Sequence, residues 1–159
     1  MKTINVGICG LGTVGSGVVN VMQRNVAAIA ARAGREVSIT HIGARRDNPA
    51  CDVGSAKVSR DIFAVVNDPD VDIVIELIGG YEPALELVMQ AIANGKHVVT
   101  ANKALIAMHG NEIFAAAEKQ GVSVLFEAAV AGGIPIIKAM REGLAANSIE
   151  WLAGIINGT

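Results

Sequence analysis

The chain has 159 residues, a length that fits one domain, and 52% of them are hydrophobic although only 3% are aromatic. Ala, Val and Ile must therefore fill the core, as they do in parallel α/β sheets whose strands are buried on both faces. The net charge of −2, with acidic and basic residues interspersed, argues against nucleic-acid binding. No apolar run reaches the roughly 18–20 residues that a membrane span needs.

Two further features favour the cytoplasm as the location. The first residues, MKTINVGICGLG, are too short and too rich in glycine for a secretory signal, and no cleavage region follows them. The two cysteines, Cys9 and Cys51, do not make a disulfide framework.

The first half of the chain alternates between strand and helix patterns. Ile4, Val6 and Ile8 alternate with Asn5, Gly7 and Cys9, which predicts a strand, and from Thr13 the apolar residues recur at helical spacing until Gly34 can end the helix. The next predicted elements are a strand over Val37–Ile42, a short helix over Asp61–Val66 and a strand over Ile73–Ile78.

The second half continues the alternation. It predicts a helix from Pro83 to Gly95, a strand over His97–Thr100, a helix from Asn111 to Gln120, a strand over Ser123–Glu127, a helix from Pro135 and a last strand over Ile149–Asn157. Strands that alternate with helices pair in parallel through right-handed crossovers. The predicted fold is therefore a doubly wound, mostly parallel α/β sheet in a single domain that covers residues 1–159.

A glycine-rich loop joins the first strand to the first helix. It has the pattern G-x-G-x-x-G and consists of Gly10, Leu11, Gly12, Thr13, Val14 and Gly15. In this context the first glycine allows a tight turn, the second lets backbone N–H groups approach a pyrophosphate, and the third lets the helix pack closely on the strand. The helix N-terminus then attracts the anion, so the loop predicts a dinucleotide site.

The end of the second strand bears on which dinucleotide binds. Sites selective for NAD usually carry an acidic residue there for the ribose 2′-hydroxyl, but this chain has Arg45 and Arg46 instead. Because a guanidinium matches a phosphate bidentately, NADP(H) is favoured. NAD(H) stays possible, since Asp47 could turn back to the ribose, and the two arginines could also be solvated loop residues.

Gly79 and Gly80 follow the strand that contains Glu76. Ligands of open α/β sheets sit at the carboxyl ends of the strands, so these two glycines are predicted to flank the cofactor. A charge inside an apolar strand needs partners, and Glu76 is equally compatible with a carboxylate that backbone donors or water satisfy.

Besides the glycine loop, the sequence contains three further motifs: TANKAL from Thr100, EAAVAGGIP from Glu127 and GIINGT from Gly154. With them the whole chain resembles the nucleotide-binding portion of homoserine dehydrogenases. The resemblance implies a Rossmann fold and reversible hydride transfer between NADP(H) and L-aspartate 4-semialdehyde, giving L-homoserine, in threonine and methionine biosynthesis.

The resemblance also assigns residues. It implies that Lys103 faces the nicotinamide and substrate and assists proton transfer, and its place after a strand end could desolvate it in part and lower its pKa. Gly158 and Thr159 would contact the small-molecule substrate. A structural sodium ion would be bound by the Glu127 side chain and by the carbonyl groups of Val130, Gly132 and Ile134; the residues alone predict only a tight turn.

In the family that the chain resembles, the polypeptide continues past Thr159 into a substrate-binding and dimerisation domain. The resemblance therefore predicts that this chain is a truncated enzyme, which binds cofactor but turns over little substrate, and that the full-length protein is a homo-oligomer. Two alternatives stay open: another NAD(P)-dependent oxidoreductase of amino-acid metabolism, or a nucleotide sensor without catalytic activity.

Overall fold

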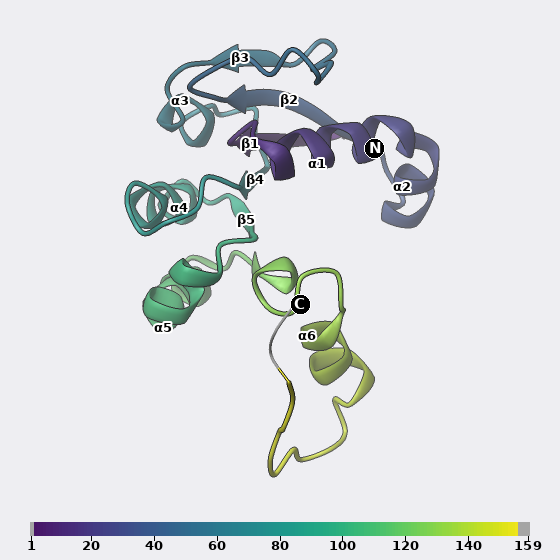
Figure 1. The fold of residues 1–159 in the computed structure, drawn as a ribbon, viewed down its shortest axis with the longest axis vertical. Helices are drawn as coiled ribbons and strands as arrows, with labels where there is room; N and C mark the ends of the chain where they lie inside the picture. Colours follow the sequence, from purple (N-terminus) through teal and green to yellow (C-terminus); the bar gives the residue numbers. More distant parts are fainter. Residues whose placement is uncertain (1, 156–159) are drawn as a thin grey trace.

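The computed structural model describes residues 2–155, which form a six-stranded parallel sheet with helices on both faces (Figure 1). Its elements, in chain order, are β1 (Ile4–Cys9), α1 (Thr13–Arg24), α2 (Val26–Ala33), β2 (Val37–Gly43), β3 (Lys57–Ser59), α3 (Phe63–Val66), β4 (Ile73–Glu76), α4 (Ala84–Ala93), β5 (His97–Thr100), α5 (Lys103–Gln120), β6 (Val124–Leu125), the 3₁₀ turn η1 (Glu127–Ala129), α6 (Ile136–Lys138) and the π-helical turn η2 (Ala139–Gly143).

The strands lie in the order β3-β2-β1-β4-β5-β6, so the chain moves outward from β1 in one direction and then returns to build the other half. This order and the parallel pairing confirm the predicted doubly wound sheet. The reversal between β1 and β4 leaves a crevice at the carboxyl ends of these two strands. Cys9 and Glu76, which end β1 and β4, are register partners at that edge.

The two central strands, β1 and β4, contribute alternate residues to two separate apolar clusters, one on each face of the sheet. Val6 and Ile8 of β1 point to one face, where Val19 of α1 packs on them. Cys9 of the same strand points to the other face, which α3, α4 and α5 cover with a larger cluster that includes Leu87 and Ile113. Because both faces are buried, the strands read as apolar runs in the sequence.

Several predicted boundaries were wrong. The helix expected from Thr13 to Gly34 is broken at Asn25, whose side-chain amide donates to the Val21 carbonyl at 3.1 Å and so competes with the backbone ladder. Gly34 does end α2, with a φ of 70°. The strand expected over Ile73–Ile78 already ends at Glu76, because the Glu76 carboxylate accepts the N–H groups of Ile78 and Gly79.

The helix expected from Asn111 begins two turns earlier, at Lys103. Asn102 is its cap, since its side-chain oxygen accepts the N–H of Leu105 at 3.1 Å. The strand expected over Ser123–Glu127 is reduced to Val124–Leu125, because Glu127 turns into η1. The short strand β3 was not predicted.

The last predicted strand, over Ile149–Asn157, is absent from its described part, residues 149–155. Trp151 is 79% exposed and Ile155 is 97% exposed, and Figure 1 shows this segment in a loop after α6 that lies apart from the strands of the sheet. The apolar pattern was interpreted as burial, but no strand of the described sheet pairs with it. Residues 156 and 157 lie outside the described residues. No helix within residues 2–155 has the length and apolar character to cross a membrane.

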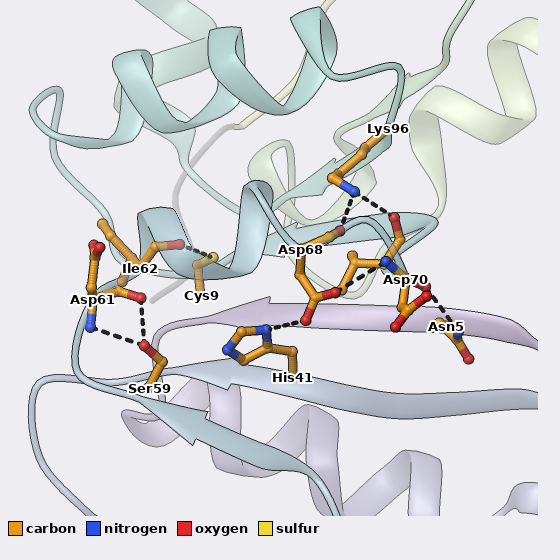
Figure 2. A network of polar contacts seen from close by, with 10 residues as sticks. Asn5, Cys9, His41, Ser59, Asp61, Ile62, Asp68, Asp70 and Lys96 are labelled. Carbon is orange, nitrogen blue, oxygen red and sulfur yellow. Dashed lines mark hydrogen bonds and ion pairs between the residues drawn. The ribbon is translucent and has the colours of Figure 1, made fainter.

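A polar network ties β2 to the turn before β4, far in sequence but adjacent in space (Figure 2). The buried His41 ring donates from Nδ1 to Oδ2 of Asp68 at 2.7 Å, and the buried Lys96 donates from Nζ to the carbonyl groups of Asp68 and Val71 at 2.6 and 2.7 Å. The Asp70 N–H, and after it the His41 ring, hold the pKa of Asp68 below its usual value of 3.8. The contacts with His41 and the Asp70 N–H therefore depend on an ionised Asp68 carboxyl group, whereas the Lys96 contacts are made to backbone carbonyl groups.

We expect this dependence to appear as acid sensitivity. Because the pKa of Asp68 is lower in the folded chain than in the unfolded chain, its contribution to the free energy of unfolding is complete above about pH 5 and is lost progressively below about pH 4. Urea titrations from pH 7 to pH 3 should show a weaker acid dependence for Asp68→Asn than for the wild type. Asp52→Asn, in an exposed loop, is the control; equal pH slopes for all three proteins would contradict the assignment.

Candidate functional site

A cleft of about 740 Å³ opens at the carboxyl edge of the sheet, between the ends of β1, β2 and β4. Its lining comes from four segments: Gly10, Leu11 and Gly12 after β1; Gly43, Ala44, Arg45, Arg46, Asp47, Asn48 and Pro49 after β2; Ile62; and Leu77, Ile78, Gly79, Glu82 and Pro83 after β4. The cleft thus brings together the first three residues of the glycine loop, the arginine pair and Gly79, whereas Thr13, Val14, Gly15 and Gly80 are not in its lining.

The three glycines of the loop have different surroundings. Gly10 has a φ of 108°, and a Cβ there would lie 2.7 Å from the Leu77 carbonyl oxygen. A Cβ on Gly15 would overlap the Gly10 carbonyl, so both positions are closed to larger residues by the protein itself. A Cβ on Gly12 would meet nothing within 4 Å, so the space in front of Gly12 is free for a ligand.

No side chain caps or neutralises the N-terminus of α1. Gly12 is its cap and offers no side-chain acceptor, and the first turn contains no acidic residue. The first N–H groups of a helix have no intrahelical partners and carry the positive end of its dipole, so they can bind an anion here. Thr13 and Val14 stand in this first turn, where Val14 is 56% exposed.

The loop after β2 carries the positive charge of the cleft. Arg45 and Arg46 are exposed and line it, and Asp47 beside them is held by Arg60, whose Nη2 lies 2.8 Å from each carboxylate oxygen. The loop is fastened to its neighbours at both ends, because Asn48 donates to the Leu11 carbonyl at 3.3 Å and Ala44 donates its N–H to the Ser59 carbonyl.

Glu76 is buried, and hydrogen bonds to both of its carboxylate oxygens connect the carboxyl ends of β4 and β5. One of its oxygens accepts the N–H groups of Ile78 and Gly79 at 2.8 and 3.1 Å, and the other accepts the Thr100 hydroxyl at 2.5 Å. Of the two possibilities left open by the sequence, the structure shows the carboxylate that backbone donors satisfy. Glu76 supports the Gly79 turn.

Thr100 and Asn102 extend this support to Lys103. The Thr100 hydroxyl accepts the Asn102 N–H at 3.0 Å, and the Asn102 amide donates to the Gly80 carbonyl at 2.7 Å. Lys103, the first residue of α5, therefore stands beside the Gly80 turn. It is exposed in the described structure, so the partial desolvation expected for it is not observed. The role of Asn102 was missed, although an Asn before a helix is a capping signal.

The residues expected at the cation site are arranged around a tight turn. Ala131 and Gly132 both have positive φ values, 56° and 58°, and the Glu127 carboxylate accepts the N–H groups of Ile137 and Lys138, each at 2.9 Å. Val130 and Ile134 lie on either side of that turn. Among residues 2–155 no group of three His, Cys, Asp or Glu side chains could hold a metal ion. Gly158 and Thr159, expected at the substrate, lie outside the described residues.

The cysteines offer no nucleophile. Burial, with a smaller contribution from Glu76, raises the pKa of Cys9 to about 12, and burial also raises the pKa of Cys51. A thiolate is the reactive form, so neither side chain suits covalent catalysis at neutral pH.

Comparison with known proteins agrees with this geometry. Residues 10–127 match the family model described as the NAD-binding domain of homoserine dehydrogenase. The chain belongs to the homoserine dehydrogenase family. Over all 159 residues it is 66% identical to the homoserine dehydrogenase of Pseudomonas aeruginosa, and it covers 37% of that protein. It is 56% identical to the enzyme of Neisseria gonorrhoeae, with the same coverage.

Solved structures of the family have the same fold. The crystal structure of a homoserine dehydrogenase from Thiobacillus denitrificans matches 99% of this chain with a TM-score of 0.93 and 64% identity, and 37% of that chain is covered. The Staphylococcus aureus enzyme at pH 7.5 matches 84% of the chain with a TM-score of 0.76 and 39% identity, and 34% of that chain is covered. The chain therefore spans somewhat more than a third of the length of these homoserine dehydrogenases.

Proposed function

We propose that this chain binds NADP(H) in preference to NAD(H) and forms the cofactor-binding part of an enzyme that interconverts L-aspartate 4-semialdehyde and L-homoserine. The observation that carries the proposal is the open N-terminus of α1 at a cleft that Arg45 and Arg46 also line. The first turn of α1 would hold the pyrophosphate, and the two guanidinium groups would hold the 2′-phosphate of the adenosine ribose. A solved structure of similar fold, 24% identical, is that of a hyperthermophilic archaeal homoserine dehydrogenase in complex with NADPH.

When bound, the nicotinamide supplies or accepts the hydride. The residues of the chain would position it: Gly79 and Gly80 allow the backbone to come close, and the Glu76–Thr100–Asn102 hydrogen bonds keep that turn beside Lys103. Lys103 would bind near the carbonyl oxygen of the substrate and move a proton there. Gly158 and Thr159 would contact the same substrate, and the whole protein would act in the cytoplasm as a homo-oligomer.

The cofactor proposal is tested by titrating NADPH and NADH separately into the 159-residue chain and following nicotinamide fluorescence. We expect tighter binding of NADPH, and a loss of roughly 10- to 100-fold in NADPH affinity, with little change for NADH, in the Arg45→Ala/Arg46→Ala variant, since hydrogen bonds to charged groups are involved. Gly12→Ala should fold normally, because its Cβ enters open space, and should lose both cofactors.

Two outcomes count against this proposal in different ways. Equal affinity of the wild type for NADPH and NADH would refute the role of the arginines and leave the glycine loop. Failure of the folded wild type to bind either dinucleotide would refute the cofactor site itself.

The proposed role of Lys103 is tested in the whole protein. Lys103→Met should lower kcat by about 10²- to 10⁴-fold, the usual contribution of a positioned proton donor or acceptor, while the KM for NADPH stays nearly constant. Lys119→Met, at the exposed far end of α5, removes the same charge and should leave kcat unchanged. A Lys103→Met enzyme with normal kcat would exclude the role.

We also propose a sodium ion at Glu127, Val130, Gly132 and Ile134. These residues fit a hard cation, because they offer one carboxylate and three carbonyl oxygens around a turn with two consecutive left-handed residues. The Glu127 oxygens and the Ile134 carbonyl each accept backbone N–H groups but keep a second lone pair. A single carboxylate suits a monovalent ion.

Sodium binding would stabilise the folded chain by mass action. The melting temperature should therefore be higher in NaCl than in KCl at equal ionic strength, and Glu127→Gln should abolish that difference. Glu118→Gln, on the exposed side of α5, is the control that should retain it. Equal melting temperatures of the wild type in the two salts would exclude the ion.

A further inference from the structure

Arg60 fastens the loop that carries the arginine pair. It follows β3 directly, and its guanidinium group makes three hydrogen bonds to a loop 13–16 residues away in the chain. Nη2 donates to Oδ1 and Oδ2 of Asp47, both at 2.8 Å, while Nη1 donates to the Ala44 carbonyl at 3.3 Å. One side chain thus joins the two ends of the segment 44–47.

Asp47 is the residue of this segment whose negative charge would disfavour the binding of a phosphate. Its carboxylate stands next to Arg45 and Arg46 in the lining of the cleft, where it would repel an anion and would instead accept hydrogen bonds from ribose hydroxyl groups. Glu82, the other carboxylate of the lining, belongs to the loop before α4. The charge that the segment presents to a 2′-substituent therefore depends on what Asp47 is bound to.

We propose that Arg60 is a positioning residue that sets the choice of dinucleotide through Asp47. While Asp47 is bound to Arg60, the guanidinium group balances its charge and engages both of its oxygens, and Arg45 and Arg46 are left to bind a 2′-phosphate. Released from Arg60, Asp47 is available to the 2′-hydroxyl and favours the dinucleotide that lacks the phosphate. The inference rests on the proposed cofactor site and adds a residue that does not line it.

The exposure of the pair makes it suited to this role. The side chains of Arg60 and Asp47 are 56% and 73% exposed, and ion pairs of that kind contribute little to folding stability. Removing either partner should therefore change the charge and shape of the loop and leave the fold intact. Substitutions of Arg60 or Asp47 are therefore expected to change the affinity for the dinucleotide rather than the folding stability.

A second explanation would be direct contact between Arg60 and the 2′-phosphate. The two differ in whether the effect of Arg60 needs Asp47, and a double-mutant cycle measures that dependence. The proteins compared are the wild-type chain, Arg60→Ala, Asp47→Asn and the double variant, each titrated with NADPH and with NADH. Arg60→Lys keeps the charge but has one nitrogen in place of the two that contact Asp47 and the Ala44 carbonyl, so its NADPH affinity should fall between those of the wild type and Arg60→Ala.

We expect Arg60→Ala to weaken NADPH binding by about three- to fivefold, the size of an exposed charge interaction, and to leave NADH binding equal or tighter. In the Asp47→Asn background the same substitution should change NADPH affinity by less than about twofold. Arg35→Ala removes an equal charge beside the amino end of β2, away from the cleft, and should leave the ratio of the two affinities unchanged.

The outcomes separate this inference from the proposed function. Equal losses of NADPH affinity on removing Arg60 in the wild-type and Asp47→Asn backgrounds would overturn it in favour of direct contact. An unchanged NADPH-to-NADH ratio in Arg60→Ala would also overturn it, while tight NADPH binding by the wild type leaves the cofactor site standing. Binding of neither dinucleotide by the folded wild type would overturn both.

Discussion

The arrangement of the cofactor edge depends on one buried carboxylate. Glu76 has no exposed surface, and an ionised group in such a place is tolerated only when its oxygens are hydrogen-bonded. The three donors that it finds come from the turn after β4 and from Thr100 at the end of β5. The need to satisfy one charge therefore fixes the Gly79 turn relative to β5, and Thr100 and Asn102 pass the constraint on to the start of α5.

The glycine loop adds a constraint of a different kind, which is steric. Gly10 and Gly15 are required because the protein's own backbone occupies the space where a Cβ would stand, whereas Gly12 faces open space. The same three-glycine pattern thus combines two positions that serve folding with one that serves a ligand. This difference explains why the motif has meaning only after a strand and before a helix, where all three demands arise together.

The sequence was a good guide wherever one local pattern decides the structure. The apolar runs of β1, β2, β4 and β5, the Gly34 cap and the placement of the glycine loop followed from spacing alone. It was a poor guide wherever the structure of a segment depends on the segment that pairs with it. Residues 149–155 have the apolar pattern of a strand, but no strand of the described chain pairs with them. The sequence did not predict a role for Arg60, because β3 is what returns the chain to Asp47. That strand has only three residues, too few to show the alternating pattern of a strand.

The site therefore consists of two layers with different tolerance to change. The buried layer, Glu76 and Thr100, holds the backbone, and a change there leaves a charge or a donor unpaired inside the protein. The exposed layer, Arg45, Arg46 and the Arg60–Asp47 pair, decides which anion the cleft attracts and contributes little to the fold. Because the two layers share no hydrogen bond in the described structure, the preference for a dinucleotide can change while the frame that positions it stays the same.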